Sequence, residues 1–502
     1  MKKLVFCSFL FITTFLLHAQ SSYFNIVETQ GIPGQNSTST IEAVHITPNE
    51  EVAVSYTGKK KLLFDIYDKD GNKVFNKYSI LEKKEHVIGH VKGDGTIKVF
   101  TVAKPSKTER QVKCHILNLE DKSHRIVPLF QTTVEKKQAL FSGQNKRQTN
   151  FAVSPTGNYL TIATDNVKRN SNSYNVYLYD ANSLDQIFEK KFFENPEKFF
   201  KSFDIAVDDS GTIYSVGKEY KDGKAEKSGE NPNYSIIVNK VSDSENTSSR
   251  IALDEDHHVA DLKIVLKENR IDLYGFYSKR RAGKITGLSK ISIDKGNIQN
   301  HDIKQTKLPQ SVLTDIYPDQ KAESKKNKDL KNYYLDYVVE DEYGNTTLLA
   351  EEFFISQTYV SNGEFGGYTM TTFHYNNILI LNLNDRGDVV WGRSIFKAAN
   401  EPSYNAFVHD SKLHVLFNTG KKLKVKDDGR VKARKGWLQS TALFDYIYDQ
   451  NGTVVQEKLR DNKGSDKYEP RNGAFQNGKF IMFNSSNLNK KLMILNPKSK
   501  EE

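Results

Sequence analysis

The segment Gln148–Phe193, QTNFAVSPTGNYLTIATDNVKRNSNSYNVYLYDANSLDQIFEKKFF, decides the fold of this chain. It contains four short apolar-rich runs, which are Asn150–Val153, Tyr159–Ala163, Asn175–Tyr179 and Gln186–Phe193. The turn Ser154–Gly157 separates the first two runs, and Asp180–Ser183 separates the last two. Apolar runs bounded by turn residues are typical of an antiparallel meander of four strands.

The same four-run unit recurs along the chain, which predicts an all-β protein, a β-propeller with four-stranded antiparallel blades. Further units span 41–80, 86–129, 202–253, 259–303, 333–396 and 404–459, and a last unit at 473–495 has only three runs. The isolated run Tyr23–Val27 can supply the missing strand beside Lys491–Leu495 and so close the ring without an open edge. We therefore expect eight blades, with seven as the alternative if one long unit is misread.

The first residues are typical of an export signal. Lys2 and Lys3 precede the apolar run Leu4–Leu17, and Ala19 is a suitable residue before a cleavage point. We expect residues 1–19 to be removed, residues 20–496 to form one propeller domain, and 497–502 to be a polar tail. Cleavage removes two lysines and Cys7, which changes the net charge from +10 to +10 − 2 = +8. Cys114 then has no partner for an internal disulfide, and we expect it to be buried as a small apolar residue.

Ser154–Thr164 (SPTGNYLTIAT) followed by Tyr174–Asp180 (YNVYLYD) resembles the repeat of TolB-like and related WD40-like propellers. That resemblance implies the blade fold, and it transfers no binding residue, since Thr156 replaces the usual Asp. The signal sequence and the Tyr, Asn and Lys bias also look like exported propellers of Bacteroidota-type bacteria. A periplasmic, outer-surface or extracellular location and a monomeric state are expected.

The loops are unequal at the two ends of the predicted ring. Turns between first and second strands and between third and fourth strands are short and define the short-turn end. Second-to-third loops and blade-to-blade connections are long and define the loop-rich end, where function is expected to concentrate. Two of its loops are candidates for binding, the aromatic loop Glu352–Asn376 and the basic segment Lys421–Lys435. The candidate contact residues are Tyr359, Phe365, Tyr368, Phe373, Tyr375, Lys421, Lys422, Lys432, Arg434, Lys435 and Trp437.

Each of these loops has two interpretations. The lysines either solvate the surface or create a positive field for an anionic glycan, lipid head groups or another envelope protein. Nucleic acid is not an expected partner, because the protein leaves the cytoplasm. The aromatic loop is either a hairpin extension packed on a neighbouring blade or an exposed platform for sugar rings or a protein.

Motifs of catalysis, cofactor binding and metal binding are scarce. The sequence lacks a Gly-x-Ser-x-Gly nucleophile elbow and a His-Glu-x-x-His zinc motif, and no cofactor is expected. A weak metal-like cluster stands between blades four and five and comprises Asp254, Asp256, His257, His258 and Asp261. An acidic, solvated corner is the alternative to a metal site there.

Two functions remain open from the sequence. The scarcity of catalytic motifs favours a non-enzymatic binding or scaffold propeller, and the alternative is a lyase or hydrolase that acts on an acidic polysaccharide. Propellers can assemble a site from distant blades, so the side chains that converge on the ring axis discriminate the two. Carboxylates or histidines converging there favour the enzyme, whereas lysines, asparagines and aromatic rings alone favour binding.

Overall fold

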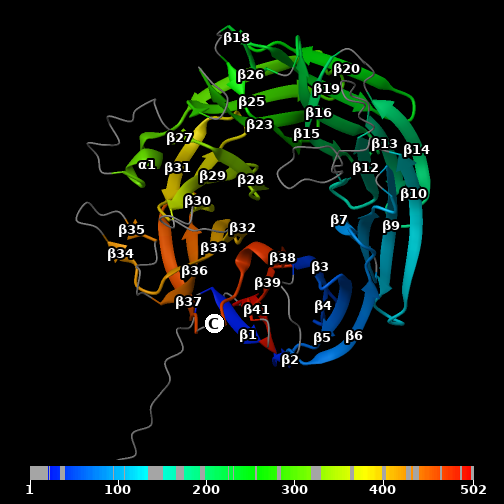
Figure 1. Cartoon of the computed structure of the whole chain (residues 1–502), viewed down its shortest axis with the longest axis vertical. Coiled ribbons are helices and arrows are strands. Elements are labelled where there is room, and N and C mark those ends of the chain that lie inside the picture. Colours follow the sequence, from blue (N-terminus) through cyan, green and yellow to red (C-terminus); the bar gives the residue numbers. More distant parts are fainter. Residues whose placement is uncertain are drawn as a thin grey trace, which may run out of the picture.

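The computed structural model of the chain is a ring of eight antiparallel β-sheets, so the predicted eight-bladed propeller is confirmed and the seven-bladed alternative is wrong (Figure 1). The structure describes residues 21, 23–33, 40–93, 95–106, 108–133, 151–165, 174–192, 198–223, 225–229, 231–254, 257–279, 284–317, 330–361, 367–397, 403–425, 431–433, 440–463, 466–486 and 489–498. The predicted signal segment 1–19 and most of the predicted tail lie outside these residues.

The first four blades follow the chain, each from its innermost to its outermost strand. Blade 1 is β3 (Thr40–Ile46), β4 (Val52–Gly58), β5 (Lys61–Tyr67) and β6 (Lys73–Ile80). Blade 2 is β7 (His86–Gly93), β8 (Thr96–Ala103), β9 (Glu109–Asn118) and β10 (His124–Thr133). Blade 3 is β11 (Phe151–Val153), β12 (Tyr159–Asp165), β13 (Tyr174–Asp180) and β14 (Gln186–Phe192). Blade 4 is β15 (Phe200–Val207), β16 (Ile213–Tyr220), β19 (Tyr234–Val241) and β20 (Asn246–Ile251).

The last four blades continue in the same order. Blade 5 is β21 (His258–Val259) with β22 (Lys263–Leu266), then β23 (Arg270–Ser278), β25 (Gly287–Asp294) and β26 (His301–Lys307). Blade 6 is β28 (Tyr333–Glu340), β29 (Thr346–Ser361), β30 (Gly367–Leu383) and β31 (Val389–Ile395). Blade 7 is β32 (Tyr404–His409), β33 (Lys412–Gly420), β36 (Thr441–Tyr448) and β37 (Val454–Asp461). Blade 8 is β38 (Ala474–Gln476), β39 (Lys479–Phe483), β41 (Leu492–Pro497) and β1 (Phe24–Glu28).

Several short strands and helices lie at the loop-rich end. Four two-stranded pieces and two short helices lie in second-to-third loops and blade-to-blade connections. They are β2 (Ile32–Pro33) with β40 (Asn489–Lys490), β17 (Lys227–Ser228) with β18 (Asn231–Pro232), β24 (Lys284–Ile285) with β27 (Leu330–Lys331), β34 (Lys424–Val425) with β35 (Val431–Lys432), α1 (Gln310–Thr314) and the 3-10 turn η2 (Pro470–Asn472). Among the described residues, no helix has the length and apolar character to cross a membrane.

The N-terminal strand closes the ring, as the sequence predicted. β1 pairs antiparallel with β41 in the register Phe24↔Pro497 to Glu28↔Met493, and it is the outermost strand of blade 8. Phe24 is only 1% exposed, and its ring packs edge-on against His414 of blade 7 at a centroid distance of 5.3 Å. The strand therefore completes blade 8 and also fastens it to blade 7.

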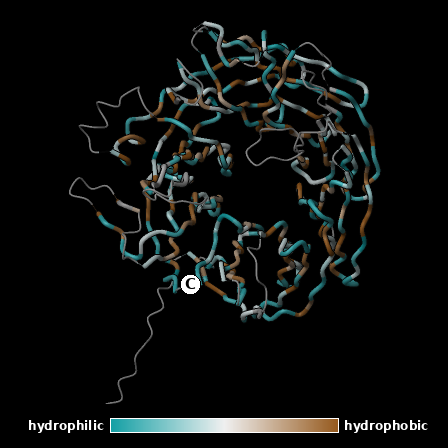
Figure 2. Tube along the Cα trace, in the orientation of Figure 1, coloured by the Kyte–Doolittle hydropathy of each residue, from teal (hydrophilic) through white to brown (hydrophobic). Residues whose placement is uncertain are grey.

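The apolar core is divided into eight clusters, one between each pair of neighbouring blades. Hydrophobic and hydrophilic residues alternate along many of the blade strands, as expected for strands whose two faces meet different neighbours (Figure 2). Cys114 is fully buried in the cluster between blades 2 and 3, where burial raises the pKa of its thiol to about 12. The prediction that Cys114 is a small buried residue is confirmed. At neutral pH its thiol stays protonated and is therefore a poor nucleophile.

One turn design recurs at the short-turn end. An Asp side chain accepts the backbone N–H groups two and four residues further on, and a glycine three residues on adopts a φ of 76–80°. Its first residues are Asp68, Asp208, Asp341 and Asp449. The repeated Asp and Gly are thus explained by hairpin geometry.

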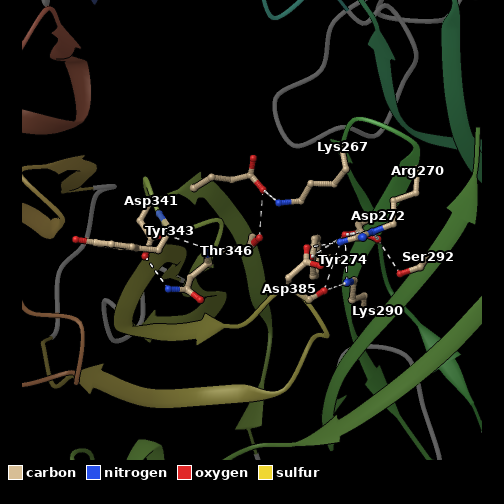
Figure 3. A network of polar contacts seen from close by, with 12 residues as sticks. Lys267, Arg270, Asp272, Tyr274, Lys290, Ser292, Asp341, Tyr343, Thr346 and Asp385 are labelled. Carbon is tan, nitrogen blue, oxygen red and sulfur yellow. Dashed lines mark hydrogen bonds and ion pairs between the residues drawn. The ribbon is translucent and has the colours of Figure 1, made fainter.

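A buried carboxylate joins blades 5 and 6 near the short-turn end (Figure 3). Asp272 on β23 is fully buried and accepts from Arg270 Nε at 3.1 Å and Ser292 Oγ at 2.7 Å. Lys290 Nζ lies 3.2 Å from Asp272 Oδ2 and donates to the backbone carbonyl of Asp385, at 2.6 Å, in the turn of blade 6. Arg270 also pairs with the Asp385 carboxylate, so two cations connect the buried Asp272 to the neighbouring blade.

In blades 5 and 6 the strand boundaries differ from those predicted from the sequence. The innermost strand of blade 5 is interrupted, because Asp261 and Leu262 leave the sheet between β21 and β22. A side chain at Gly275 of β23 would clash with the Asp261 carbonyl, at 2.2 Å from the position of its Cβ, so the glycine permits this close approach. In blade 6, the aromatic loop is a continuation of β29 and β30 as one long hairpin.

Candidate active site on the innermost strands

Two consecutive residues of β28 reach one arginine because the strand bulges there. The pairing of β28 with β29 skips Asp336, between Leu335↔Ala350 and Tyr337↔Leu349. In a regular strand, neighbouring side chains point to opposite faces, and a bulge re-aims one of them. As a result, Arg471 of η2 lies 3.8 Å from Asp336 Oδ1 and donates from Nη1 to Tyr337 Oη at 3.4 Å.

Tyr404, the first residue of β32, completes this group. Its hydroxyl donates to Asp336 Oδ2 at 2.9 Å, and its carbonyl accepts from Tyr337 Oη at 3.3 Å. The rings of Tyr337 and Tyr404 meet edge-on with centroids 5.3 Å apart. We call Asp336, Tyr337, Tyr404 and Arg471 the axial cluster, because β28, β32 and β38 lie toward the centre of the ring (Figure 1).

The axial cluster combines an accessible cation with groups whose proton affinity is shifted. Burial raises the pKa of the Asp336 carboxyl, although the charge of Arg471 and the hydrogen bond from Tyr404 act against it. Burial also raises the pKa of Tyr337 to about 12, again opposed by Arg471. The side chain of Arg471 is 37% exposed, so its guanidinium can meet an anion from solvent. The cluster therefore offers a carboxyl group that can act as a base, a phenol that is protonated at neutral pH, and a cation.

A buried ion pair supports the axial cluster. Lys397 Nζ donates to Glu351 Oε1 at 2.5 Å, to Ser403 Oγ at 2.9 Å and to the Tyr375 carbonyl at 3.2 Å. The side chains of Lys397 and Glu351 are 3% and 5% exposed. This lysine fixes the connection after β31 against the base of the hairpin, next to Tyr404.

Further carboxyl groups lie on the innermost strand of blade 4, at Asp204, and in the break of the innermost strand of blade 5, at Asp261. Lys263 Nζ lies 3.8 Å from Asp204 Oδ1, and the charge of Lys263 also acts on Asp261 and Asp336. Burial raises the pKa of Asp204 and of Asp261, in each case opposed first by Lys263. The charge of Lys263 thus acts on carboxyl groups of three successive blades.

The hairpin β29–β30 presents aromatic rings beside this site. The Phe353 ring is tilted against Tyr375 with centroids 4.7 Å apart and is stacked with Phe373 at 6.5 Å. It also meets the ring of Tyr334 of β28 edge-on at 6.2 Å. Phe373 is 47% and Tyr334 40% exposed. The charges of Arg471 and Asp336 act on the phenol of Tyr375. The expected hairpin extension is confirmed, but these rings pack within blade 6 and leave part of their surface open.

Other predicted contact residues are placed only in part. Tyr359 and Tyr368 lie on β29 and β30, and Lys432 lies on β35, with side chains outside the described part of the structure. Lys421 pairs with Asp461, and Lys422 follows it at the surface. Phe365, Arg434, Lys435 and Trp437 lie outside the described residues.

The metal-like cluster is dispersed. His257 and His258 are buried, Asp254 is exposed, the charge of Lys263 acts on Asp261, and Asp256 is outside the described residues. His257 Nδ1 is 2.7 Å from Gln305 Nε2, and the His257 ring meets Tyr277. Within the described part of the chain, no three His, Cys, Asp or Glu side chains come together as metal ligands.

Sequence reasoning missed the axial cluster. Its members come from blades 6 and 7 and from the connection to blade 8, and no local motif contains them. The available signal was an ionisable residue inside an otherwise apolar first strand, as with Asp204 in Phe203–Val207 and Asp336 in Leu335–Val339. Such residues are unusual in a buried strand and mark candidate sites.

The comparisons with known proteins found similar solved structures but no family. No protein-family model and no curated protein matches the sequence. Among solved structures, the chain is similar to a prolyl endopeptidase at 7% identity and a TM-score of 0.42, over 89% of this chain and 55% of that one. It is also similar to the β-propeller domain of the Trilobed protease from Pyrococcus furiosus, at 10% identity and a TM-score of 0.36, over 83% of this chain and 97% of that one. A polysaccharide lyase is similar at 8% identity and a TM-score of 0.39, over 94% of this chain and 99% of that one. The chain thus spans about half the length of the prolyl endopeptidases.

The expectation of a non-enzymatic binding or scaffold propeller is corrected. The solved propellers that the chain resembles belong to peptidases and a polysaccharide lyase, although at this identity the likeness shows the fold alone. The innermost strands also carry carboxyl groups, with Asp204 beside Lys263 and Asp336 beside Arg471, and carboxyl groups at the ring axis are the feature that distinguishes the enzyme interpretation from the binding one.

Proposed function

We propose that this protein is a propeller enzyme that cleaves an acidic polysaccharide by β-elimination at the axial cluster. The observation that supports this proposal is the shared contact of Asp336 and Tyr337 with Arg471, produced by the bulge in β28. Elimination next to a uronate carboxylate needs a cation on that carboxylate, a base for the neighbouring carbon and an acid for the leaving oxygen. The axial cluster contains one group of each kind.

In this mechanism Arg471 binds the carboxylate of the uronic acid and neutralises the charge that develops on it. Asp336 removes the proton from C5, and the electron pair of that C–H bond forms the C4=C5 double bond as the C4–O bond breaks. Tyr337 donates its hydroxyl proton to the departing oxygen. Water then returns a proton to Tyr337 and accepts one from Asp336, so no oxidant or cofactor is consumed.

The aromatic hairpin and the basic segment fit the same substrate. Exposed rings at Phe373 and Tyr334 offer flat apolar surfaces for sugar rings beside the cluster. Tyr359, Phe365, Tyr368 and Tyr375 are proposed to extend this platform. Lys421, Lys422, Lys432, Arg434, Lys435 and Trp437 are proposed to attract the anionic chain.

Hydrolysis is the second candidate, because carboxyl groups are the usual acid and base for glycosidic bonds. Burial raises the pKa of Asp204, Asp261 and Asp336, and the charge of Lys263 acts on all three carboxyl groups. A carboxyl with a raised pKa can act as the acid while a neighbour that stays ionised acts as the base.

The test is incubation of the protein with polygalacturonate, alginate and chondroitin sulfate. New reducing ends report any cleavage, whereas ultraviolet absorbance of the C4=C5 bond reports elimination only. We expect both signals on one polymer, and a loss of about 100-fold or more in kcat/KM for Tyr337→Phe and Arg471→Ala. The rate should fall as pH decreases through a pKa above the usual 3.8 of an Asp, because the base Asp336 becomes protonated.

Arg386→Ala is the matched control, because Arg386 is an exposed arginine in a turn at the short-turn end. It should leave the rate unchanged. Reducing ends without absorbance would replace elimination by hydrolysis. Full activity of Tyr337→Phe would remove the axial cluster from the reaction.

We further propose that the protein is exported, monomeric and related to TolB-like propellers of Bacteroidota-type bacteria. The support is the sequence of residues 1–19 and the repeat at Ser154–Asp180. We expect the intact mass of protein recovered from the periplasm or medium to correspond to a chain that begins at Gln20. Protein that retains residues 1–19 in a membrane fraction would contradict this expectation.

A further inference from the structure

A second polar site lies between blades 1 and 2. A cavity of about 440 Å³ opens between the β4–β5 turn and the connection from β6 to β7. Its size falls within the range of small-molecule sites. Its lining includes Glu42, Lys59, Lys60, Lys61, Lys84 and Glu85. Both segments are at the loop-rich end, because they are a second-to-third loop and a blade-to-blade connection.

The cavity has more cations than partners for them. Lys113 pairs with Glu82 at the rim. Glu85 accepts from Thr101 Oγ1 at 2.5 Å and from the Glu82 N–H at 2.7 Å. Burial would raise the pKa of the Glu85 carboxyl, but the hydrogen bonds from His115, Thr101 and the Glu82 N–H outweigh burial and hold it at about 2. The carboxylates of Glu82 and Glu85 therefore already have partners within the protein.

Three lysines remain for a ligand. Among the described residues, Lys59, Lys60 and Lys84 have no carboxylate partner, and all three are exposed. The ammonium of Lys61 instead lies 3.9 Å from the centre of the Tyr78 ring. Burial, followed by the charges of Arg110 and Lys84, lowers the pKa of Lys104, so the field of Lys84 also reaches a further lysine.

Glu42 adds an acceptor to this basic cavity. It is the residue that the pairing of β3 with β4 skips, and Thr57 Oγ1 donates to its Oε1 at 2.7 Å. Lysines beside a carboxyl group suit a ligand that carries both an anionic group and hydroxyl donors. A sugar acid has this combination, whereas inorganic sulfate lacks the donors.

We infer that this cavity is a distal subsite that binds an acidic sugar residue of the same polysaccharide. This inference rests on the proposed function. β3 and β7 face β28 and β32 across the centre of the ring, and only blade 8 separates blade 1 from blade 7 (Figure 1). A chain bound in the cavity and at the axial cluster therefore spans the loop-rich end, which favours long polymers over short fragments.

The test compares Lys60→Ser/Lys84→Ser with Lys69→Ser, an exposed lysine of the same blade at the short-turn end. Binding of polygalacturonate, alginate and chondroitin sulfate is measured directly in a Tyr337→Phe background, over a salt series. We expect the double variant to weaken binding of one polymer about tenfold or more and to reduce its salt dependence. In the parent background, its kcat/KM should fall for the polymer and stay unchanged for a trisaccharide. Lys69→Ser should match the parent.

Glu42→Gln distinguishes a sugar acid from a simple anion. It should weaken binding of the polymer but not of inorganic sulfate, because only the sugar donates hydroxyl hydrogen bonds to the carboxylate. Equal polymer binding by parent and double variant would overturn the subsite, even if the polymer is cleaved. Weakened binding by both the double variant and Glu42→Gln without any cleavage would support the subsite and contradict the enzyme.

Discussion

Deleting residues 20–28 is expected to destabilise blade 8 and cause aggregation. The deletion removes β1, exposes the ladder edge of β41 and opens the surface that Phe24 covers. Phe24→Ala alone is expected to lower the free energy of unfolding by about 3–5 kcal/mol, because it leaves a cavity between blades 7 and 8. Chemical denaturation followed by fluorescence measures the change.

Asn25→Ala is the control for this prediction, since Asn25 is an exposed residue of the same strand. It should change the free energy of unfolding by less than about 0.5 kcal/mol. If the deletion variant melted at the same temperature as the parent, closure of the ring by β1 would not contribute to stability.

Asp272→Ala is expected to have the second large effect. The substitution leaves Lys290, whose side chain is 5% exposed, buried without its carboxylate, and it also removes a partner of Arg270. Breaking a buried ion pair from one side costs about 3–5 kcal/mol, because the remaining charge is not compensated. Thermal unfolding should therefore begin at a clearly lower temperature.

Asp385→Ala tests the other end of the same network. Asp385 pairs with Arg270 at the surface, where its side chain is 62% exposed, and solvent screens such pairs. We expect a loss below about 1 kcal/mol. Equal effects of the two substitutions would mean that burial of Asp272 is not what makes the network stabilising.

Most of the fold was predictable because blades are local structures. Each four-stranded unit is formed by contiguous residues, so its strands can be recognised in the sequence. Turns such as Asp68–Asn72 are recognisable by their Asp and Gly residues. The closing role of Tyr23–Val27 followed from counting strands. The break between β21 and β22 was not predictable, because it depends on the space above Gly275 rather than on the residues that leave the sheet.

Only those parts of the candidate site whose residues lie close together in the sequence were predictable. The aromatic residues Phe373 and Tyr375 were found because they crowd one loop, and both lie on the hairpin beside the axial cluster. Arg471 and Asp336 are far apart in the sequence, and their meeting depends on the curvature of the ring and on a bulge. Neither feature leaves a pattern in one strand.

The pairing of β1 with β41 also sets an order of events during folding. Thr29 accepts a hydrogen bond from the Leu492 N–H, 463 residues away, so β1 is synthesised long before its partner strand β41. Blades 1 to 7 can form from adjacent hairpins as the chain lengthens, but β1 must wait with an unpaired edge until β41 has been synthesised. Contacts of such long sequence separation slow folding, so ring closure is expected to be the late, rate-limiting step. A ribosome-bound chain that lacks β41 would therefore be vulnerable to proteases at its N-terminal end and depend on chaperones there.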